Sequence, residues 1–126
     1  MNIRFLTPTL HGVVDYIAAA ALLTMPFVLG LGASSPLAKW LAVGTGLAVV
    51  VTSLLTDYKY GAARILPFKG HLAIDAAVAT VFALAPALFG FTGLDAWFYW
   101  VNAIAVFAVV ALSEPGESSE PSPAHA

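Results

Sequence analysis

The stretches HGVVDYIAAAALLTMPFVLGL (residues 11–31) and HLAIDAAVATVFALAPALFGF (residues 71–91) decide the fold of this chain. Each opens with His-x-x-x-Asp and continues as an apolar run. A membrane helix needs about 20 mostly apolar residues, and two further stretches also meet this requirement. We therefore expect four spans, over residues 9–31, 37–56, 70–91 and 96–113.

The composition of the chain predicts that lipid is its solvent. The 126 residues are 60% hydrophobic and 10% charged, and the mean hydropathy is +0.90, whereas soluble domains carry roughly 25% charged residues. A net charge of -2 argues against a nucleic-acid partner. The absence of cysteine excludes disulfides, thiolate metal sites and thiol catalysis. A signal peptide is a weaker interpretation of the first span, because His11 and Asp15 interrupt it and it exceeds an ordinary signal core in length.

The links between the expected spans predict the topology. Residues 32–36 and 92–95 are short turns, so each makes two neighbouring spans antiparallel. Basic residues favour the cytoplasmic side of a membrane. Four of them lie before the first span and in the middle link, against one near the opposite side: Arg4, Lys59, Arg64 and Lys69 against Lys39. We therefore expect both termini and the middle link in the cytoplasm.

Aromatic residues are expected to anchor the spans at both membrane interfaces, where Trp and Tyr are enriched. The expected outer anchors are Trp40, Trp97, Tyr99 and Trp100. The expected inner anchors are Tyr16, Tyr58 and Tyr60. Both sets agree with the topology that the basic residues predict.

The two stretches belong to an internal repeat with a spacing of 60 residues, in which His11 falls on His71 and Asp15 on Asp75. The match continues without a gap through Arg4/Arg64, Leu6/Leu66, Pro26/Pro86, Gly30/Gly90, Trp40/Trp100 and Ser53/Ser113. Each copy holds two spans, so both copies enter the membrane in the same direction. The predicted fold is all-α: a four-transmembrane-helix bundle made of two tandem parallel helical-hairpin repeats.

The expected domains follow from this repeat. Residues 1–57 form the first helical-hairpin repeat and residues 58–113 form the second. The remaining sequence, EPGESSEPSPAHA, has nothing to bury, so we expect a disordered cytoplasmic tail over residues 114–126. His125 should be solvated in that tail.

Four ionisable residues are the candidates for chemistry: His11, Asp15, His71 and Asp75. Charged groups within a bilayer are costly and usually face the bundle interior. A His and an Asp four residues apart share one helix face, and the repeat axis brings both pairs towards one point. The expected ion-pair partners at the inner boundary are Arg4 and Arg64, with Asp57 as a partner for Arg64.

Three interpretations of these residues remain open. In the first, the carboxylates and histidines hold the two hairpins together, and the protein needs no cofactor. In the second, they bind a divalent metal, or His11 and His71 serve as axial ligands of a haem. In the third, they belong to a proton or small-solute pathway in a homo-oligomer or membrane complex. No catalytic motif is found, so no enzyme activity is expected.

The repeated unit resembles the SPW-repeat family of small bacterial integral membrane proteins. The resemblance rests on the two quoted stretches and on TDYKYGAARILPFKGH, which joins them, and it covers the chain from about residue 4 to residue 113. The tripeptide that names the family reads MPF at residues 25–27 and APA at residues 85–87, without its Trp. The resemblance implies the topology above in a bacterial cytoplasmic membrane, with a structural or accessory role and no assigned reaction.

Overall fold

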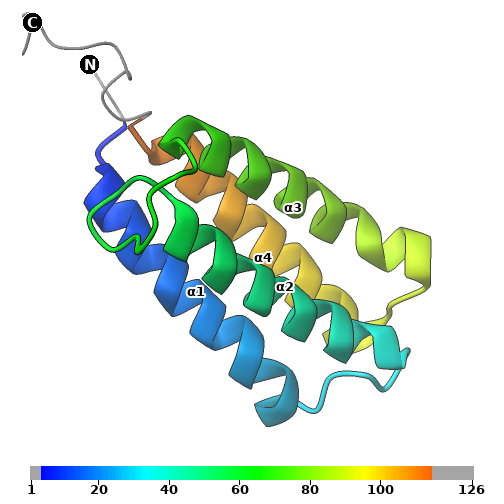
Figure 1. Cartoon of the computed structure of the whole chain (residues 1–126). Helices are drawn as coiled ribbons and strands as arrows, with labels where there is room; N and C mark the ends of the chain where they lie inside the picture. The colour runs from blue at the N-terminus through cyan, green and yellow to red at the C-terminus, as the bar shows by residue number, and fades with distance from the viewer. Residues whose placement is uncertain (1–3, 115–126) are drawn as a thin grey trace, which may run out of the picture.

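The computed structural model describes residues 4–114, which form four α-helices in antiparallel succession (Figure 1). The helices are α1 (Pro8–Val28), α2 (Pro36–Leu55), α3 (Phe68–Phe89) and α4 (Gly93–Leu112). Their bounds lie within three residues of the four expected spans. The predicted tail from residue 115 onwards, including His125, lies outside the described residues.

Each helix is long and apolar enough to cross a membrane. The helices contain 20 to 22 residues, which at about 1.5 Å per residue span the roughly 30 Å of a hydrocarbon core. Their outward faces carry large apolar side chains, such as Ile17, Leu88 and Ile104, which are 64%, 67% and 70% exposed. Such a surface is stable against lipid and not against water, so the chain is a multi-pass membrane protein.

Local sequence signals start and end the helices. Pro8 and Pro36 occupy first helical positions, where proline loses no hydrogen bond. The Thr7 hydroxyl caps α1 by accepting a hydrogen bond from Leu10 N–H at 3.2 Å. Gly90 ends α3 in the left-handed conformation, with φ of 71°, which glycine adopts without strain.

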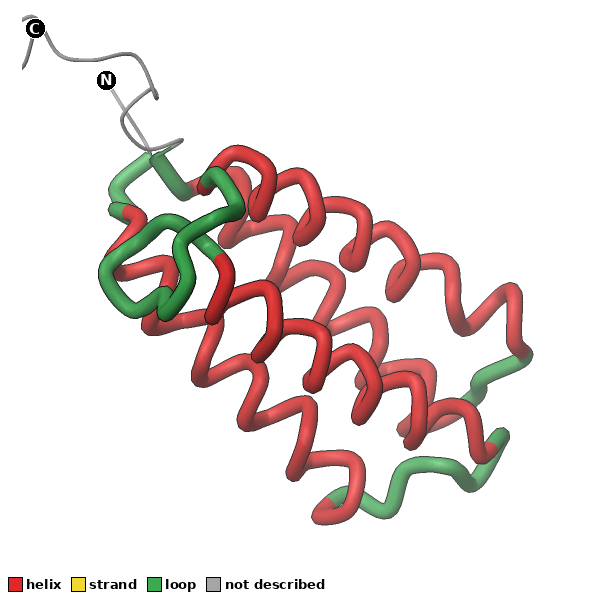
Figure 2. The backbone as a smooth tube through the Cα atoms, in the orientation of Figure 1, coloured by secondary structure: helices red, strands yellow, loops and turns green. Residues whose placement is uncertain are grey.

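The helices form two hairpins, in which α1 packs along α2 and α3 along α4. The hairpins approach each other less closely than the helices within them do. The middle link, residues 56–67, and both ends of the described chain lie at one end of the bundle, and the two hairpin turns lie at the other (Figure 2). We call these the link end and the turn end.

The buried faces of α1 and α3 recur at the predicted spacing of 60. The buried residues of α1 include His11, Asp15, Ala19, Leu22 and Pro26. The residues 60 positions later are all buried in α3: His71, Asp75, Ala79, Phe82 and Pro86. The ionisable pairs therefore lie on the faces that the helices turn inwards.

Most buried positions of the second helices recur at a different spacing from the one that the ungapped match predicts. Ala38, Ala42 and Gly46 are buried in α2, and the residues 57 positions later, Asp95, Tyr99 and Ala103, are buried in α4. At this spacing Trp40 falls on Trp97, and both are exposed. The reason for the different spacing is the length of the turns: residues 29–35 join α1 to α2, whereas only residues 90–92 join α3 to α4.

Two of the expected aromatic anchors are core residues instead. Trp40, Trp97 and Trp100 are exposed on the outside of the bundle, as expected of anchors. Tyr99 is fully buried and donates a hydrogen bond to the Ala38 carbonyl at 2.6 Å. Tyr58 is 5% exposed and lies over the inward-facing ionisable residues. Each ring finds a buried acceptor for its hydroxyl, which lipid cannot offer.

A buried carboxylate joins the hairpins at the turn end. Asp95, in the first turn of α4, is 2% exposed. It accepts hydrogen bonds from Gly32 N–H and Ser34 N–H, both at 2.9 Å, and from the Ser34 hydroxyl. All three donors belong to the turn of the first hairpin, so Asp95 fixes that turn against the second hairpin.

Candidate functional site

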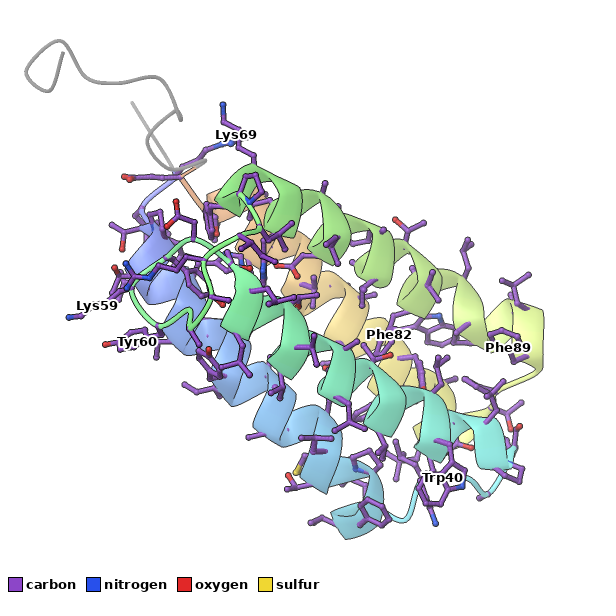
Figure 3. The ribbon with its side chains drawn as sticks, in the orientation of Figure 1. Trp40, Lys59, Tyr60, Lys69, Phe82 and Phe89 are labelled. Atoms are coloured by element: carbon purple, nitrogen blue, oxygen red, sulfur yellow. The ribbon has the colours of Figure 1, made fainter. Side chains whose placement is uncertain are left out.

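The four predicted site residues meet at the link end of the bundle. His11 and Asp15 lie in the first turns of α1, and His71 and Asp75 lie in the first turns of α3. Both histidines are fully buried, and the Asp15 and Asp75 residues are 6% and 9% exposed. We call these residues the His/Asp quartet. Lys59 and Lys69 mark the same end of the molecule, opposite Trp40 and Phe89 (Figure 3).

Each histidine of the quartet contacts both carboxylates through its Nε2 atom. His11 Nε2 lies 3.2 Å from Asp15 Oδ1 and 2.9 Å from Asp75 Oδ2. His71 Nε2 lies 2.8 Å from Asp15 Oδ2 and 3.3 Å from Asp75 Oδ2. The quartet therefore joins α1 to α3, and hence one hairpin to the other, through contacts across the interface as well as along each helix.

The outward Nδ1 atoms of both histidines contact hydroxyl groups that close α2 and α4. His11 Nδ1 lies 2.6 Å from Ser113 Oγ, and His71 Nδ1 lies 2.7 Å from Thr56 Oγ1. Ser113 and Thr56 follow the last residues of α4 and α2, respectively. Each imidazole thus contacts the residue that follows the second helix of the opposite hairpin.

These hydroxyls fix the hydrogen on each imidazole. Ser113 Oγ donates to the Val109 carbonyl at 2.6 Å, and Thr56 Oγ1 donates to the Thr52 carbonyl at 2.5 Å. Two oxygens this close need a hydrogen between them. Because each hydroxyl has spent its only hydrogen on a carbonyl, it must accept from the imidazole, so both histidines carry a hydrogen on Nδ1.

The two Nε2 atoms differ in their contacts. His11 Nε2 has hydrogen-bond geometry with Asp75 Oδ2. His71 Nε2 is completely buried and makes no hydrogen bond within residues 4–114, although an oxygen lies 2.8 Å away. That oxygen lies off the direction in which an Nε2–H bond would point. A buried nitrogen close to two carboxylates is therefore left without a hydrogen-bond partner among the described residues.

Two aromatic rings cover the quartet at the link end. The Tyr58 hydroxyl donates to Asp15 Oδ2 at 3.1 Å, and burial raises the pKa of this hydroxyl, so it donates as a neutral phenol. The Phe68 ring lies 5.0 Å from the His11 ring in an edge-on arrangement. Gly12 makes room for this cover, because a Cβ atom there would lie 3.2 Å from the Tyr58 ring. These rings shield the quartet from water.

On its other side the quartet borders a cavity inside the bundle. The cavity has a volume of about 110 Å³, and Asp15 and Asp75 form part of its lining. The rest of the lining is apolar apart from Asn102. Among residues 4–114, the two carboxylates are therefore the only ionisable groups that face this cavity.

Backbone hydrogen bonds beside the quartet join the same helices as the contacts of the histidines with Ser113 and Thr56. Leu6, before α1, accepts from Glu114 N–H at 2.8 Å and donates to the Leu112 carbonyl at 3.0 Å. Leu66, before α3, accepts from Asp57 N–H at 2.8 Å and donates to the Leu55 carbonyl at 2.7 Å. The segment before α1 is thus tied to the end of α4, and the segment before α3 to the end of α2.

Arg64, one of the predicted ion-pair partners, makes other contacts. Arg64 donates to the carbonyls of Lys59 and Gly61, at 2.9 and 3.3 Å, within its own link. Asp57 is exposed, and no ion pair between Asp57 and Arg64 occurs in the described part of the chain. Arg4 lies exposed before α1. The ion pairs found for these carboxylates among the described residues are those with His11 and His71.

Sequence reasoning missed Thr56, Ser113 and Phe68 as members of this site. The ungapped spacing of 60 pairs Ser113 with Ser53, whose Oγ is buried without a hydrogen-bond partner among the described residues. Thr56 and Ser113 are the hydroxyl residues at which the second span of each hairpin ends. This shared position could have identified both of them from the sequence.

Comparison with protein families, with curated proteins and with solved structures finds no match to this chain.

Proposed function

We propose that this chain is a small structural or accessory unit of the membrane, of SPW-repeat type, whose two hairpins are equivalent repeats docked by the His/Asp quartet. The observation that carries the proposal is the crossed contact pattern, in which each histidine touches the carboxylate of the other hairpin at 2.8 to 2.9 Å. The two spacings, 60 between first helices and 57 between second helices, support the repeat relation. The matching backbone ties at Leu6 and Leu66 support it too.

The energetics of burial favour a docking role. Placing an Asp at the centre of a membrane helix costs roughly 2.5–3.5 kcal/mol on insertion scales. Here the two imidazoles interact with the two carboxylates across the interface. The free-energy cost of burying the carboxylates is therefore fully offset only when the two hairpins are packed together. Removing one partner leaves a buried charge without compensation, which costs about 3–5 kcal/mol in buried ion pairs. The quartet therefore specifies one mutual arrangement of the hairpins.

The distribution of charge supports an orientation with the link end in the cytoplasm of a bacterial cell. Lys59, Arg64 and Lys69 lie at this end, together with Arg4, whereas Lys39 lies near the turn end. Positive residues are retained on the cytoplasmic side during insertion. In this orientation the quartet lies just inside the cytoplasmic boundary of the bilayer.

Two of the alternative functions fit less well. A proton pathway needs a chain of ionisable groups. Within the part of the chain that the structure describes, the cavity beyond Asp15 and Asp75 offers only Asn102 as a further polar side chain. A haem between His11 and His71 needs room for a porphyrin between the two nitrogens. The carboxylates fill that space, at 2.8 to 3.3 Å from both Nε2 atoms.

A double-mutant cycle across the interface tests the docking role. We expect Asp15→Ala and His71→Ala, alone and together, to show a coupling free energy of about 0.5–3 kcal/mol in detergent unfolding, because residues in contact are not additive. The cycle is run with a chelator present, so that only the protein's own groups contribute. Thr24→Ala and Thr80→Ala, which remove exposed hydroxyls from the same two helices, form the control pair. Additive effects of Asp15 and His71 would show that the quartet does not dock the hairpins.

A further inference from the structure

We infer that the His/Asp quartet is a binding site for one divalent transition-metal ion, held by Nε2 of His11 and His71 and by one carboxylate oxygen each of Asp15 and Asp75. The inference rests on the quartet of the proposed function and names the ligand that completes it. These four ligand atoms lie within 4.8 Å of one another. They come from two helices that are already fixed in register by the bundle.

The orientation of the imidazoles is the first support. Metal-bound histidines donate their second ring N–H to a neighbouring group, which fixes the tautomer. Here both Nδ1–H groups donate to hydroxyls, those of Ser113 and Thr56, at 2.6 and 2.7 Å. Both Nε2 atoms therefore turn towards the centre of the quartet, which is the arrangement that a metal ion requires.

The unpartnered nitrogen of His71 is the second and independent support. Its Nε2 atom is buried, lies 2.8 Å from an oxygen of Asp15 and 3.3 Å from an oxygen of Asp75, and has no hydrogen-bond partner within residues 4–114. In a metal site the ion occupies the in-plane direction from the nitrogen, and the other ligands lie to the side of that direction. The off-axis position of Asp15 Oδ2, 2.8 Å away, fits this arrangement better than it fits a hydrogen bond.

The spacing of the ligands is close to that of a tetrahedral site. Metal–ligand bonds of about 2.0–2.2 Å place neighbouring ligands about 3.3–3.6 Å apart. With Asp15 Oδ2 and Asp75 Oδ2 as the two oxygens, three nitrogen–oxygen separations run from 2.8 to 3.3 Å, and all four ligand atoms lie within 4.8 Å of one another. Because each carboxylate can rotate about its Cβ–Cγ bond, its oxygens can adjust to the spacing that a metal ion requires.

Charge and donor type select the class of ion. Two carboxylates balance the two positive charges of a divalent ion, so the loaded site is neutral, as a buried site within a membrane should be. Imidazole nitrogen and carboxylate oxygen suit zinc and its neighbours in the first transition row. The chain has no cysteine to favour a softer ion. Tyr58 holds Asp15 from the link end as a supporting donor.

Metal titration of the full chain tests this inference. The protein is purified in detergent through a histidine-free affinity tag, stripped with a chelator and titrated with Zn²⁺ or Co²⁺ alone. We expect one ion per chain, visible absorption of four-coordinate Co²⁺ and a higher melting temperature with metal, since a ligand of the folded state stabilises it. Binding of less than one ion per chain, or binding without the Co²⁺ bands, overturns the inference.

Variants separate this site from adventitious binding. His11→Gln with His71→Gln should abolish stoichiometric uptake, whereas His125→Gln, which changes the third histidine of the chain, should leave it unchanged. Thr56→Val with Ser113→Ala keeps all four ligands and should weaken binding by about 10–100-fold, as loss of supporting hydrogen bonds does. This variant decides the question if the ligand variants do not fold, and unchanged affinity in it would contradict the site.

The metal site and the docking role can fail separately. Coupling between Asp15 and His71 in the presence of chelator, without uptake of metal by the wild-type chain, supports docking and overturns the metal site. Stoichiometric uptake that is lost in the His11 and His71 variant, without coupling in the chelated protein, supports the metal site and overturns docking by the protein's groups alone.

Discussion

His11 Nδ1 lies 2.6 Å from Ser113 Oγ, so the first membrane helix is bound to the residue that ends the fourth, 102 positions along the chain. The equivalent contact, between His71 and Thr56, binds the third helix to the end of the second. Hydroxyl groups that directly follow a membrane helix thereby hold the imidazoles whose other nitrogens face the carboxylates.

Ser113→Ala should lower the stability of the bundle. The variant leaves the Nδ1–H of His11 buried without an acceptor, which costs about 1–3 kcal/mol. We expect a lower melting temperature in detergent, measured by circular dichroism. Ser53→Ala is the matched control, because the Ser53 hydroxyl is buried but makes no hydrogen bond in residues 4–114. A larger loss from Ser53→Ala than from Ser113→Ala would contradict the spacing of 57 between α2 and α4.

The lengths of the apolar runs were enough to predict the four spans, and the spacing of His11, Asp15, His71 and Asp75 was enough to predict the meeting of the quartet. Hydrophobic length and the periodicity of a helix face are local properties, so they can be read from the sequence. The partners Thr56 and Ser113 depend instead on the lengths of the two turns, which differ and shift the register of the second helices. A comparison of the two hairpins without gaps cannot detect that shift.

The aromatic residues illustrate a second limit. Tyr58 and Tyr99 lie near the ends of spans, where interfacial anchors are expected. Only the tertiary structure decides whether such a ring faces lipid or the core. Tyr99 faces the Ala38 carbonyl, and Tyr58 faces Asp15. Arg64 is a third residue whose contacts the sequence does not reveal. Its guanidinium donates hydrogen bonds to carbonyls of its own link.

Asp95→Asn should loosen the turn end of the bundle. The carboxylate accepts from Gly32 and from two groups of Ser34, and an amide keeps only one acceptor oxygen. We expect a loss of about 1–3 kcal/mol in the free energy of unfolding and faster hydrogen exchange at Gly32 and Ser34. Asp57→Asn, at an exposed position, is the control. Equal stability of the two variants would rule out a role of Asp95 in joining the two hairpins.

Gly61→Ala should disrupt the middle link. A Cβ atom at residue 61 would lie 1.9 Å from the Thr56 carbonyl oxygen, so the backbone must move. Because Thr56 also holds His71, the displacement should reach the quartet. Gly44→Ala is the matched control, since a Cβ atom there meets nothing within 4 Å and alanine favours a helix by up to about 1 kcal/mol. We expect the first variant to melt at a lower temperature than the wild type and the second at an equal or higher one.

The orientation of the bundle can be tested with single cysteines, because the chain has none of its own. Ala63→Cys lies in the middle link and Ala33→Cys in the turn of the first hairpin, both at exposed positions. If positive residues set the topology, a membrane-impermeant thiol reagent added to intact cells should label residue 33 and spare residue 63 until the membrane is opened. The opposite labelling would place the quartet at the outer boundary, where a bound ion would exchange with the cell exterior and not with the cytoplasm.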